Sequence, residues 1–436
     1  MQKRYRLAFY ILILLFFMPA YSRLDLELTQ GITSAIPIAI TFFAGPSVSG
    51  DRDQKIIQVI KNDLQQSGQF RVIVKPDDIL GQTPESIQEV NYSYWQKQKV
   101  NVVIIGAIRA SGMNHYQVTF TLVNVFDSDN VLLSDSFNVR VQNLRSLAHH
   151  ISDLIYQKLT GVRGIFSTRI AYVFVQRFPD KLPIYTLEVA DADCFNPQPL
   201  LVSHMPIMSP TWSPDGKKIA YVSFEGQHAA IYVQNLTTGD RQRISDAPGI
   251  NGAPAFSPDG THLALVLSKT GNPNIYVLNL ATKELREITN DWAIDTEPAW
   301  SPDEKILLFT SNRDGTPQIY QYSFKDNTIT RLTYRGDYNA RASFLPDGQS
   351  IVMMHRENGL FGIAYQDLTT GRLKILTQSG SDESPSLAPN GKMIVYATEY
   401  GGQGVLAQVS IDGQVKLRLP SREGIVQEPA WSPFLG

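Results

Sequence analysis

Residue types that could carry chemistry are few in this 436-residue chain. The single cysteine, Cys194, excludes an intramolecular disulfide and any metal site built on several cysteines. His149 and His150 are neighbours on a predicted helix over 144–159, where adjacent side chains diverge and cannot converge on one metal ion. The stretch Gly401-Gly402-Gln403-Gly404 lies between two predicted strands, which is typical of a hairpin loop rather than of a phosphate cradle.

Motifs for catalysis or cofactor binding are missing from the sequence. It contains no HExxH, no P-loop, no GxSxG and no GxGxxG after a strand. Aspartates that recur in Pro-Asp-Gly phrases are explained by turn chemistry alone. We therefore expect a protein that is not an enzyme, with no metal and no cofactor.

Composition points to recognition of proteins. Lys plus Arg total 39 and Asp plus Glu total 41, a net charge of −2, so the basic surface that nucleic-acid binding requires is not expected. The 25 prolines and 30 glycines indicate many turns.

A repeat in the second half accounts for many of these turns. Its phrase reads Trp-Ser-Pro-Asp-Gly in the fullest copy, and successive prolines are 44, 44, 44, 43 and 44 residues apart. The six copies begin at Trp212, Phe256, Trp300, Phe344, Leu387 and Trp431. A period in the forties with several short strands per unit is typical of a propeller blade. One unit is predicted as four strands, at 253–256, 263–268, 274–280 and 285–289.

The two ends of the repeat region predict how the ring closes. The sixth phrase has a first strand, 428–431, without a successor, and 168–175 and 184–190 resemble blade strands without a first strand. If the C-terminal strand completes that blade, six blades fill residues 169–436 and no sheet edge is left open.

The preceding segment is predicted as a small α/β domain with a mixed sheet. Strands are expected at 36–43, 70–74 and 100–106, the last as a continuous apolar run suited to a central strand. A hairpin is expected from 116–126 and 131–141, and helices at 53–67, 86–99 and 144–159. The fold class is thus an α/β N-terminal domain, residues 23–162, followed by an all-β six-bladed β-propeller, residues 163–436.

Residues 1–22 are expected to be a secretory signal peptide. Lys3, Arg4 and Arg6 precede an apolar run over 7–18, and small residues follow at Ala20 and Ser22. Twelve apolar residues fall short of the ~20 that span a bilayer as a helix. The product should be exported, without a membrane span.

Three stretches of the sequence resemble the TolB family. They are the junction LTGVRGIFSTRIAYV over 159–173, the run NGAPAFSPDG over 251–260 and the ending PAWSP over 429–433. The resemblance implies a periplasmic component of the Tol-Pal system, which supports outer-membrane integrity and envelope constriction during cell division. It implies the lipoprotein Pal as a partner at the propeller mouth and TolA as a partner of the N-terminal part, with other outer-membrane-associated proteins also in reach.

Loops that lead into the inner strands should carry the site for Pal, because they ring one end of the channel while the blades hold them. We expect Asn251, Ala253, Thr296 and Glu297 to contribute, with Ala253 and Thr296 matching family contact positions by resemblance. Ile250 departs from the resemblance, because a family member has a histidine at this position. The alternative is that these loops only shape tight connections between blades.

The mature N-terminus is the second candidate site. Leu24, Leu26 and Leu28 alternate with Asp25 and Glu27, a strand pattern that could add to a partner's sheet or fold back on its own domain. In the family this stretch binds TolA, and its exposure responds to Pal. A competing hypothesis for the whole chain is an exported propeller that binds a small molecule or assists a hydrolase.

Overall fold

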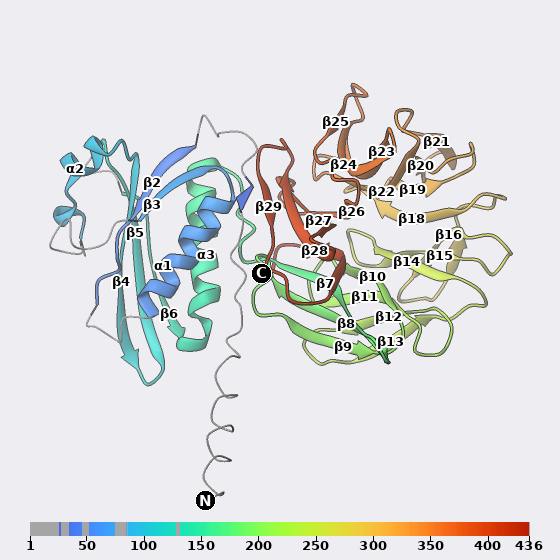
Figure 1. Ribbon diagram of the computed structural model, residues 1–436, viewed down its shortest axis with the longest axis horizontal. Helices are drawn as coiled ribbons and strands as arrows, with labels where there is room; N and C mark the ends of the chain where they lie inside the picture. Colours follow the sequence, from blue (N-terminus) through green and yellow to red (C-terminus); the bar gives the residue numbers. More distant parts are fainter. Residues whose placement is uncertain are drawn as a thin grey trace, which may run out of the picture.

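Two domains lie side by side, an α/β domain and a propeller (Figure 1). This computed structural model describes residues 26–27, 35–45, 52–74, 84, 86–127 and 131–435. The expected signal peptide over 1–22 lies outside these residues. None of the helices in the described part of the chain is both long and apolar enough to cross a membrane.

The N-terminal domain is a five-stranded mixed sheet in the order β3-β2-β4-β5-β6. Its strands are β2 (Ile36–Ile40), β3 (Phe70–Val74), β4 (Val102–Gly112), β5 (His115–Asn124) and β6 (Val131–Arg140). Its α-helices are α1 (Arg52–Gln66), α2 (Tyr92–Lys97) and α3 (Leu144–Thr160), with 3-10 turns at Ile87–Glu89 and Val141–Asn143. β2 is parallel to β3 and β4, and β4, β5 and β6 are antiparallel.

Apolar side chains cover both faces of β4. On one face α1 and α3 pack through residues such as Ile60 and Ile151, in the core that contains Ile104. On the other face Trp95 of α2 packs in a second cluster with Val103. The central strand predicted from the apolar run therefore lies in the middle of the sheet. Figure 1 shows that α1 and α3 occupy the side of the sheet that is turned to the propeller.

One predicted helix, 86–99, is divided. Residues 87–89 form a 3-10 turn, and α2 begins only after Asn91, whose side chain accepts the N–H of Tyr94 at 3.0 Å. This cap starts a new helix, because it satisfies a backbone donor that an intact longer helix would have bonded internally. The strand predicted over 36–43 is also shorter, because β2 ends at Ile40.

The second domain is a propeller of six antiparallel sheets, which confirms the predicted fold class. Five blades follow the repeat directly. Their strands, from the channel outward, are β10 (Ile207–Trp212), β11 (Lys218–Ser223), β12 (Ala230–Asn235) and β13 (Arg241–Ser245); β14 (Asn251–Phe256), β15 (His262–Leu267), β16 (Asn274–Asn279) and β17 (Leu285–Glu287); β18 (Asp295–Trp300), β19 (Ile306–Ser311), β20 (Gln318–Ser323) and β21 (Thr328–Arg331); β22 (Tyr338–Phe344), β23 (Ser350–Glu357), β24 (Leu360–Asp367) and β25 (Leu373–Ile375); and β26 (Glu383–Leu387), β27 (Met393–Tyr400), β28 (Gln403–Ser410) and β29 (Lys416–Arg418).

The sixth blade joins the two ends of the domain. Its strands are β7 (Arg169–Phe178), β8 (Lys181–Asp191), β9 (Gln198–Ser203) and, on the inside, β30 (Ile425–Trp431). β30 pairs with β7 in antiparallel register, and the indole of Trp431 donates to the Thr168 hydroxyl at 2.8 Å. The N–H of Arg169 donates to Ser432 Oγ at 3.0 Å. The last strand is therefore buried inside the ring, not attached to its surface.

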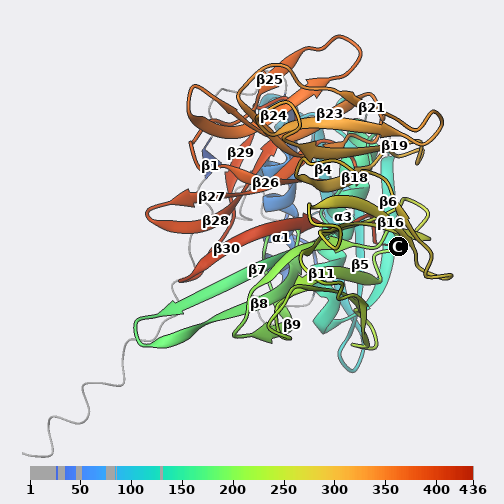
Figure 2. The ribbon, with the colours of Figure 1, turned by 90° about the vertical axis from the view of Figure 1, so that its right-hand side faces the viewer.

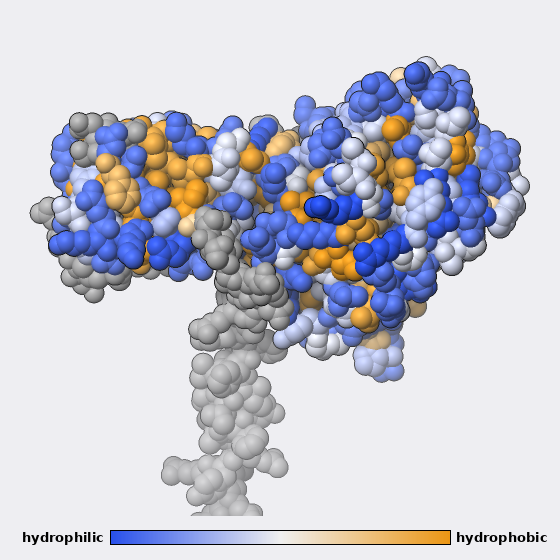
Figure 3. All heavy atoms as spheres, turned by 90° about the horizontal axis from the view of Figure 1, so that it is seen from above, coloured by the Kyte–Doolittle hydropathy of each residue, from blue (hydrophilic) through white to orange (hydrophobic). Residues whose placement is uncertain are grey.

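A short linker fixes the two domains to each other. The carboxylate of Asp153 in α3 accepts the N–H groups of Phe166 and Ser167 at 2.7 and 3.0 Å. On the propeller side, the Asn390 amide donates to the Arg163 carbonyl at 3.0 Å. Seen from above, the two domains form two lobes with hydrophobic patches among a largely hydrophilic surface (Figure 3).

Candidate functional site

The two ends of the propeller channel carry different groups. We call one the turn end, formed by the turns between the first and second strands of the blades, such as 257–260, and by the loops between third and fourth strands. We call the other the loop end, formed by the segments that lead into the inner strands, such as 288–294, and by the turns between second and third strands. The linker contact at Asn390 and the ion pair of Arg145 with Asp191 place the N-terminal domain against the turn end.

Carboxylates at the turn end are occupied within their own turns. The Ser257 hydroxyl donates to Asp259 at 2.5 Å and accepts the N–H of His262 at 3.0 Å. Asp259 also accepts the hydroxyl of Thr261, and these bonds, chiefly the one from Ser257, lower the pKa of Asp259 to about 2. The same serine-to-aspartate bond is 2.6 Å at Ser213.

Neighbouring turns interlock around the ring. Gly260 has φ +72°, and a Cβ placed on it would lie 3.2 Å from Cγ of Pro214 in the turn of the preceding blade. At Gly391, with φ +70°, a Cβ would lie 2.8 Å from Cδ of Pro346. Glycine is favoured at both positions by its backbone angle and by this close contact. The repeated proline and glycine therefore form contacts between blades as well as turns within them.

Six residues with positive φ form one ring around the channel. They occur once in each inner strand, at a β-bulge between it and the second strand of its blade, and none is glycine. The ring residues are Ser209, Ala253, Glu297, Arg341, Ser384 and Glu428. A bulge of this kind inserts an extra residue, which interrupts the alternation of side chains between the two faces of the strand and redirects one of them. All six line one cavity of about 450 Å³ along the channel.

Arg341 lies between the two carboxylates of this ring, Glu297 and Glu428. Arg341 Nε donates to Glu297 Oε1 at 2.8 Å, Nη1 donates to Ser384 at 2.7 Å, and Nη2 lies 3.5 Å from Glu428. Burial opposes the charge on Arg341, but Glu428 and Glu297 more than offset it, so its pKa is raised above the ordinary value. Glu297 also accepts the Thr310 hydroxyl at 2.8 Å. These contacts join the inner strands of neighbouring blades across the channel.

The loop end exposes large apolar side chains. Trp292 is 67% exposed, Tyr334 76%, Ile294 51% and Ile250 50%. Others on the same end are Phe178, Leu182, Met205, Leu360 and Tyr400. A set of exposed apolar residues gathered at one end of a domain is typical of a surface that binds another protein.

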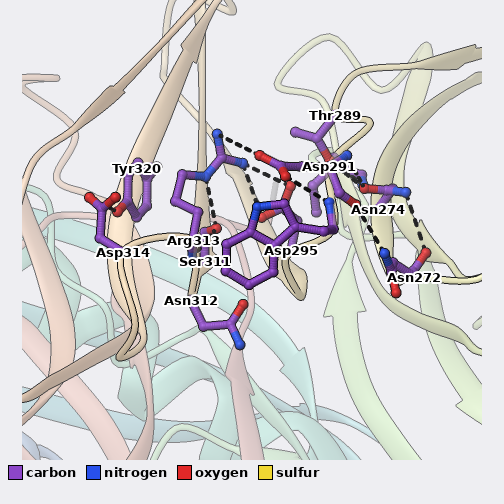
Figure 4. A network of polar contacts seen from close by, with 12 residues as sticks. Asn272, Asn274, Thr289, Asp291, Asp295, Ser311, Asn312, Arg313, Asp314 and Tyr320 are labelled. Atoms are coloured by element: carbon purple, nitrogen blue, oxygen red, sulfur yellow. Dashed lines mark hydrogen bonds and ion pairs between the residues drawn. The ribbon is translucent and has the colours of Figure 1, made fainter.

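A polar network holds the segment that carries Trp292 and Ile294 (Figure 4). Asp295 is fully buried, and both of its carboxylate oxygens accept Nη2 of Arg313, at 3.1 and 3.0 Å. The N–H of Ile294 donates to the Asn312 side chain at 2.8 Å, and Asn274 accepts the N–H of Asp291 at 3.3 Å. The exposed side chains are therefore displayed on a backbone that is already fixed.

The structure places the four predicted propeller residues at different depths. Asn251 is 1% exposed, and its amide bonds within its own loop, donating to the Ala247 carbonyl at 2.6 Å. Ala253 and Glu297 belong to the channel ring, and Thr296 is half-buried at the start of β18. Asn251 thus shapes a loop, whereas Thr296 remains partly accessible close to the exposed apolar side chains of the loop end.

The N-terminal candidate segment lies beside a blade. The strand β1 (Leu26–Glu27) pairs antiparallel with β29, with Leu26 opposite Leu417 and Glu27 opposite Lys416 (Figure 2). It forms a fifth strand on the outer edge of that blade. The other predicted residues of the segment, Leu24, Asp25 and Leu28, lie outside the described residues.

Trp292, Ile294 and Tyr334 were not among the site residues predicted from the sequence. A signal was available, because Trp292 and Ile294 interrupt a polar stretch between two predicted strands where turn residues would be expected. The two neighbouring histidines of the predicted helix 144–159 differ in exposure. His149 is buried and His150 is exposed, with its ring edge-on to Phe137 at 5.4 Å.

Comparison with known proteins agrees with this architecture. Residues 24–131 match the TolB amino-terminal domain family, and residues 156–435 match the TolB beta propeller domain family. The chain is 71% identical to the Tol-Pal system protein TolB of Coxiella burnetii (strain RSA 493 / Nine Mile phase I) over the full length of both. It is 57% identical to the Tol-Pal system protein TolB of Legionella pneumophila (strain Corby), covering 97% of this chain and 98% of that one.

A solved structure shares both domains. The crystal structure of TolB from Acinetobacter baumannii superimposes with a TM-score of 0.85 at 41% sequence identity, covering 94% of this chain and 100% of that one. Each half of the fold described above thus has its counterpart in one and the same family. This chain belongs to the TolB family and is a component of the Tol-Pal system.

Proposed function

We propose that this protein works in the periplasm as a non-enzymatic interaction component of the Tol-Pal system. It binds the lipoprotein Pal at the loop end of the propeller and TolA through its N-terminal segment. Through these two contacts it supports outer-membrane integrity and envelope constriction during cell division.

The rigid display of Trp292 supports the first contact most directly. Large aromatic side chains that are exposed on a fixed backbone lose little conformational freedom on binding, so their burial contributes most of its free energy to affinity. The buried Asp295–Arg313 pair supplies that fixed backbone. Thr296 is half-buried in the inner strand β18, and the ring residue Ala253 lines the channel cavity. An extended segment of a partner that enters the channel from the loop end could reach both.

A binding experiment with purified Pal tests this contact. We expect Thr296→Ala and Glu297→Ala to weaken Pal binding, measured by calorimetry and by pull-down from an envelope extract. Thr238→Ala, an exposed threonine in the β12–β13 loop of the turn end, is the matched control and should bind as the parent does. Binding that is unchanged in both the Thr296→Ala and the Glu297→Ala variant would overturn the proposed location.

The second contact depends on strand addition. Backbone groups of residues 26 and 27 that pair with β29 cannot pair with a partner's sheet edge at the same time. The docked segment is therefore the state that withholds TolA binding, and its release from β29 is the state that permits it.

Deleting residues 23–30 separates the two contacts. We expect the variant to lose TolA binding in a pull-down while its affinity for Pal, measured by calorimetry, stays within about twofold of the parent. The physical reason is that the segment lies on the outer edge of a blade, whereas the proposed Pal site lies at the loop end of the channel. Retained TolA binding would show that the segment is only an ordered tail.

A further inference from the structure

A buried polar cluster lies where α3 meets the propeller. Asp63 of α1 and His149 of α3 are each 3% exposed, although charged side chains are rarely buried so deeply without a partner. Asp191 ends β8, and Asp193 lies in the loop that follows. The cluster borders a cavity of about 380 Å³ between the two domains. The function proposed above assigns it no role.

One ring nitrogen of His149, Nδ1, forms a hydrogen bond with Asp63. Its Nδ1 lies 2.8 Å from Asp63 Oδ2, and the Asp63 carboxylate raises the pKa of His149 although burial alone would lower it. A carboxylate on one ring nitrogen fixes the orientation of an imidazole and makes its other nitrogen a better metal ligand.

The other ring nitrogen has no hydrogen-bond partner among the residues that the structure describes. Nε2 of His149 is buried and accepts or donates no hydrogen bond within the described part of the chain. A buried polar atom without a partner costs free energy, and a bound water molecule or ion would remove that cost. A ring nitrogen of His149 and one carboxylate oxygen from each of Asp191 and Asp193 lie within 4.8 Å of one another. Because Asp63 occupies Nδ1, Nε2 is the nitrogen that remains for a ligand there.

Arg145 bridges the same two carboxylates from α3. Its Nε donates to Asp191 Oδ2 at 3.1 Å, and its Nη2 donates to Asp193 Oδ2. The opposite oxygen of Asp193 accepts the N–H of Phe195 at 3.1 Å. Arg145 therefore holds both carboxylates beside His149, but its positive charge also competes with any cation for them.

We propose that His149 Nε2, Asp191 and Asp193 form a binding site for a divalent transition-metal ion, Zn²⁺ in the first place, that joins the N-terminal domain to the propeller. One imidazole and two carboxylates are a ligand set that Zn²⁺ accepts, with water from the adjoining cavity as a fourth ligand. Ligand atoms around tetrahedral Zn²⁺ lie roughly 3.3 Å apart, so three atoms that lie within 4.8 Å of one another must approach by up to about 1.5 Å. The half-buried Asp191 and Asp193 side chains leave room for that movement.

Titration of untagged, metal-free protein with ZnCl₂ tests the site. We expect one bound equivalent in calorimetry, and a Co²⁺ absorption spectrum of a site with nitrogen and oxygen ligands. His149→Gln and Asp193→Asn should each weaken binding tenfold or more. Arg145→Gln should strengthen it, because this change removes the competing charge. His150→Gln is the matched control, since the exposed neighbour on the same helix should leave binding unchanged.

The outcomes separate the site from nonspecific binding of zinc. His149→Gln could unfold because it disturbs a buried pair, so each variant is first checked by its thermal unfolding curve. Asp193→Asn removes a partly exposed carboxylate and keeps the test valid if His149→Gln does not fold. Binding in Asp193→Asn that equals the parent, or absence of binding in the parent at about 1 mM ZnCl₂, would overturn the proposal.

Discussion

The two ends of the propeller are built from the same repeat but hold their residues in different ways. At the turn end, Ser257 bonds to Asp259 two residues away, and Gly260 packs on Pro214 of the preceding blade. At the loop end, Asp295 is held by Arg313 from 18 residues away, and the segment beside it exposes Trp292. Local sequence dictates the first arrangement, whereas contacts between strands that differ from blade to blade dictate the second.

If the loop end binds Pal as proposed, this difference separates stability from recognition. The turn end satisfies its polar groups internally and repeats with little change, so it ties blades together. The loop end leaves apolar side chains in solvent, which costs the free protein stability and offers a partner a surface to bury. Substitutions at the two ends should therefore change different measurements.

The largest effect should come from breaking the ring on which both ends depend. Deleting residues 428–436 removes most of the inner strand that pairs with β7, including the buried Trp431. We expect the free energy of unfolding to fall by more than about 5 kcal/mol, since loss of a buried tryptophan alone costs about 3–5 kcal/mol. Thermal unfolding followed by circular dichroism measures this.

A shorter truncation is the control for that experiment. Removing residues 435–436 leaves β30 intact and should shift the midpoint by a few degrees at most. If the longer deletion unfolds at the temperature of the full chain, the closed ring is not what stabilises the propeller.

The next effect should appear in recognition only. Trp292→Ala should weaken Pal binding by about 2 kcal/mol, roughly 30-fold in Kd, because exposed aromatic residues on a fixed backbone are typical hot spots. The melting temperature should stay nearly constant because the side chain is 67% exposed. Phe126→Ala, another exposed aromatic residue, in the N-terminal domain, serves as the control. If the two variants bind Pal with equal affinity, the loop end is not the surface that binds Pal.

A smaller effect, in stability only, is expected at the turn end. Ser257→Ala removes a buried hydroxyl that donates to Asp259 and accepts the N–H of His262. The free energy of unfolding should fall by about 1 kcal/mol, measured by urea denaturation. Pal affinity should not change. A loss of affinity without a loss of stability would mean that the two ends are coupled.

The smallest effect should appear in the stability of the protein at low pH. Asp259 has its pKa lowered to about 2, chiefly by the Ser257 hydroxyl, from about 3.9 in an unfolded chain. Its stabilising contribution is therefore fully present above about pH 4 and is lost as the pH falls towards 2. Asp259→Asn should reduce the pH dependence of unfolding between these limits.

Repeated elements were predictable because their causes are local. The strands of the blade containing Asn251–Phe256 were predicted to within a few residues, since turn residues recur beside each apolar run. The helix predicted over 86–99 was wrong in extent because a single capping side chain, Asn91, divides it. Asn251 was expected at the partner surface, but its polar group is satisfied within the loop, which only the folded backbone shows.

The sequence by itself determined the six-fold repeat, the mixed α/β domain before it and the family. These depend on periodicity and turn chemistry, which act over a few residues. Only the tertiary structure decided that Glu297 and Arg341 form an ion pair in the channel, that Trp292 is exposed, and that His149 meets Asp191 across the domain boundary. Each of these depends on residues far apart in the chain, and their proximity is fixed only when the ring closes and the two domains pack together.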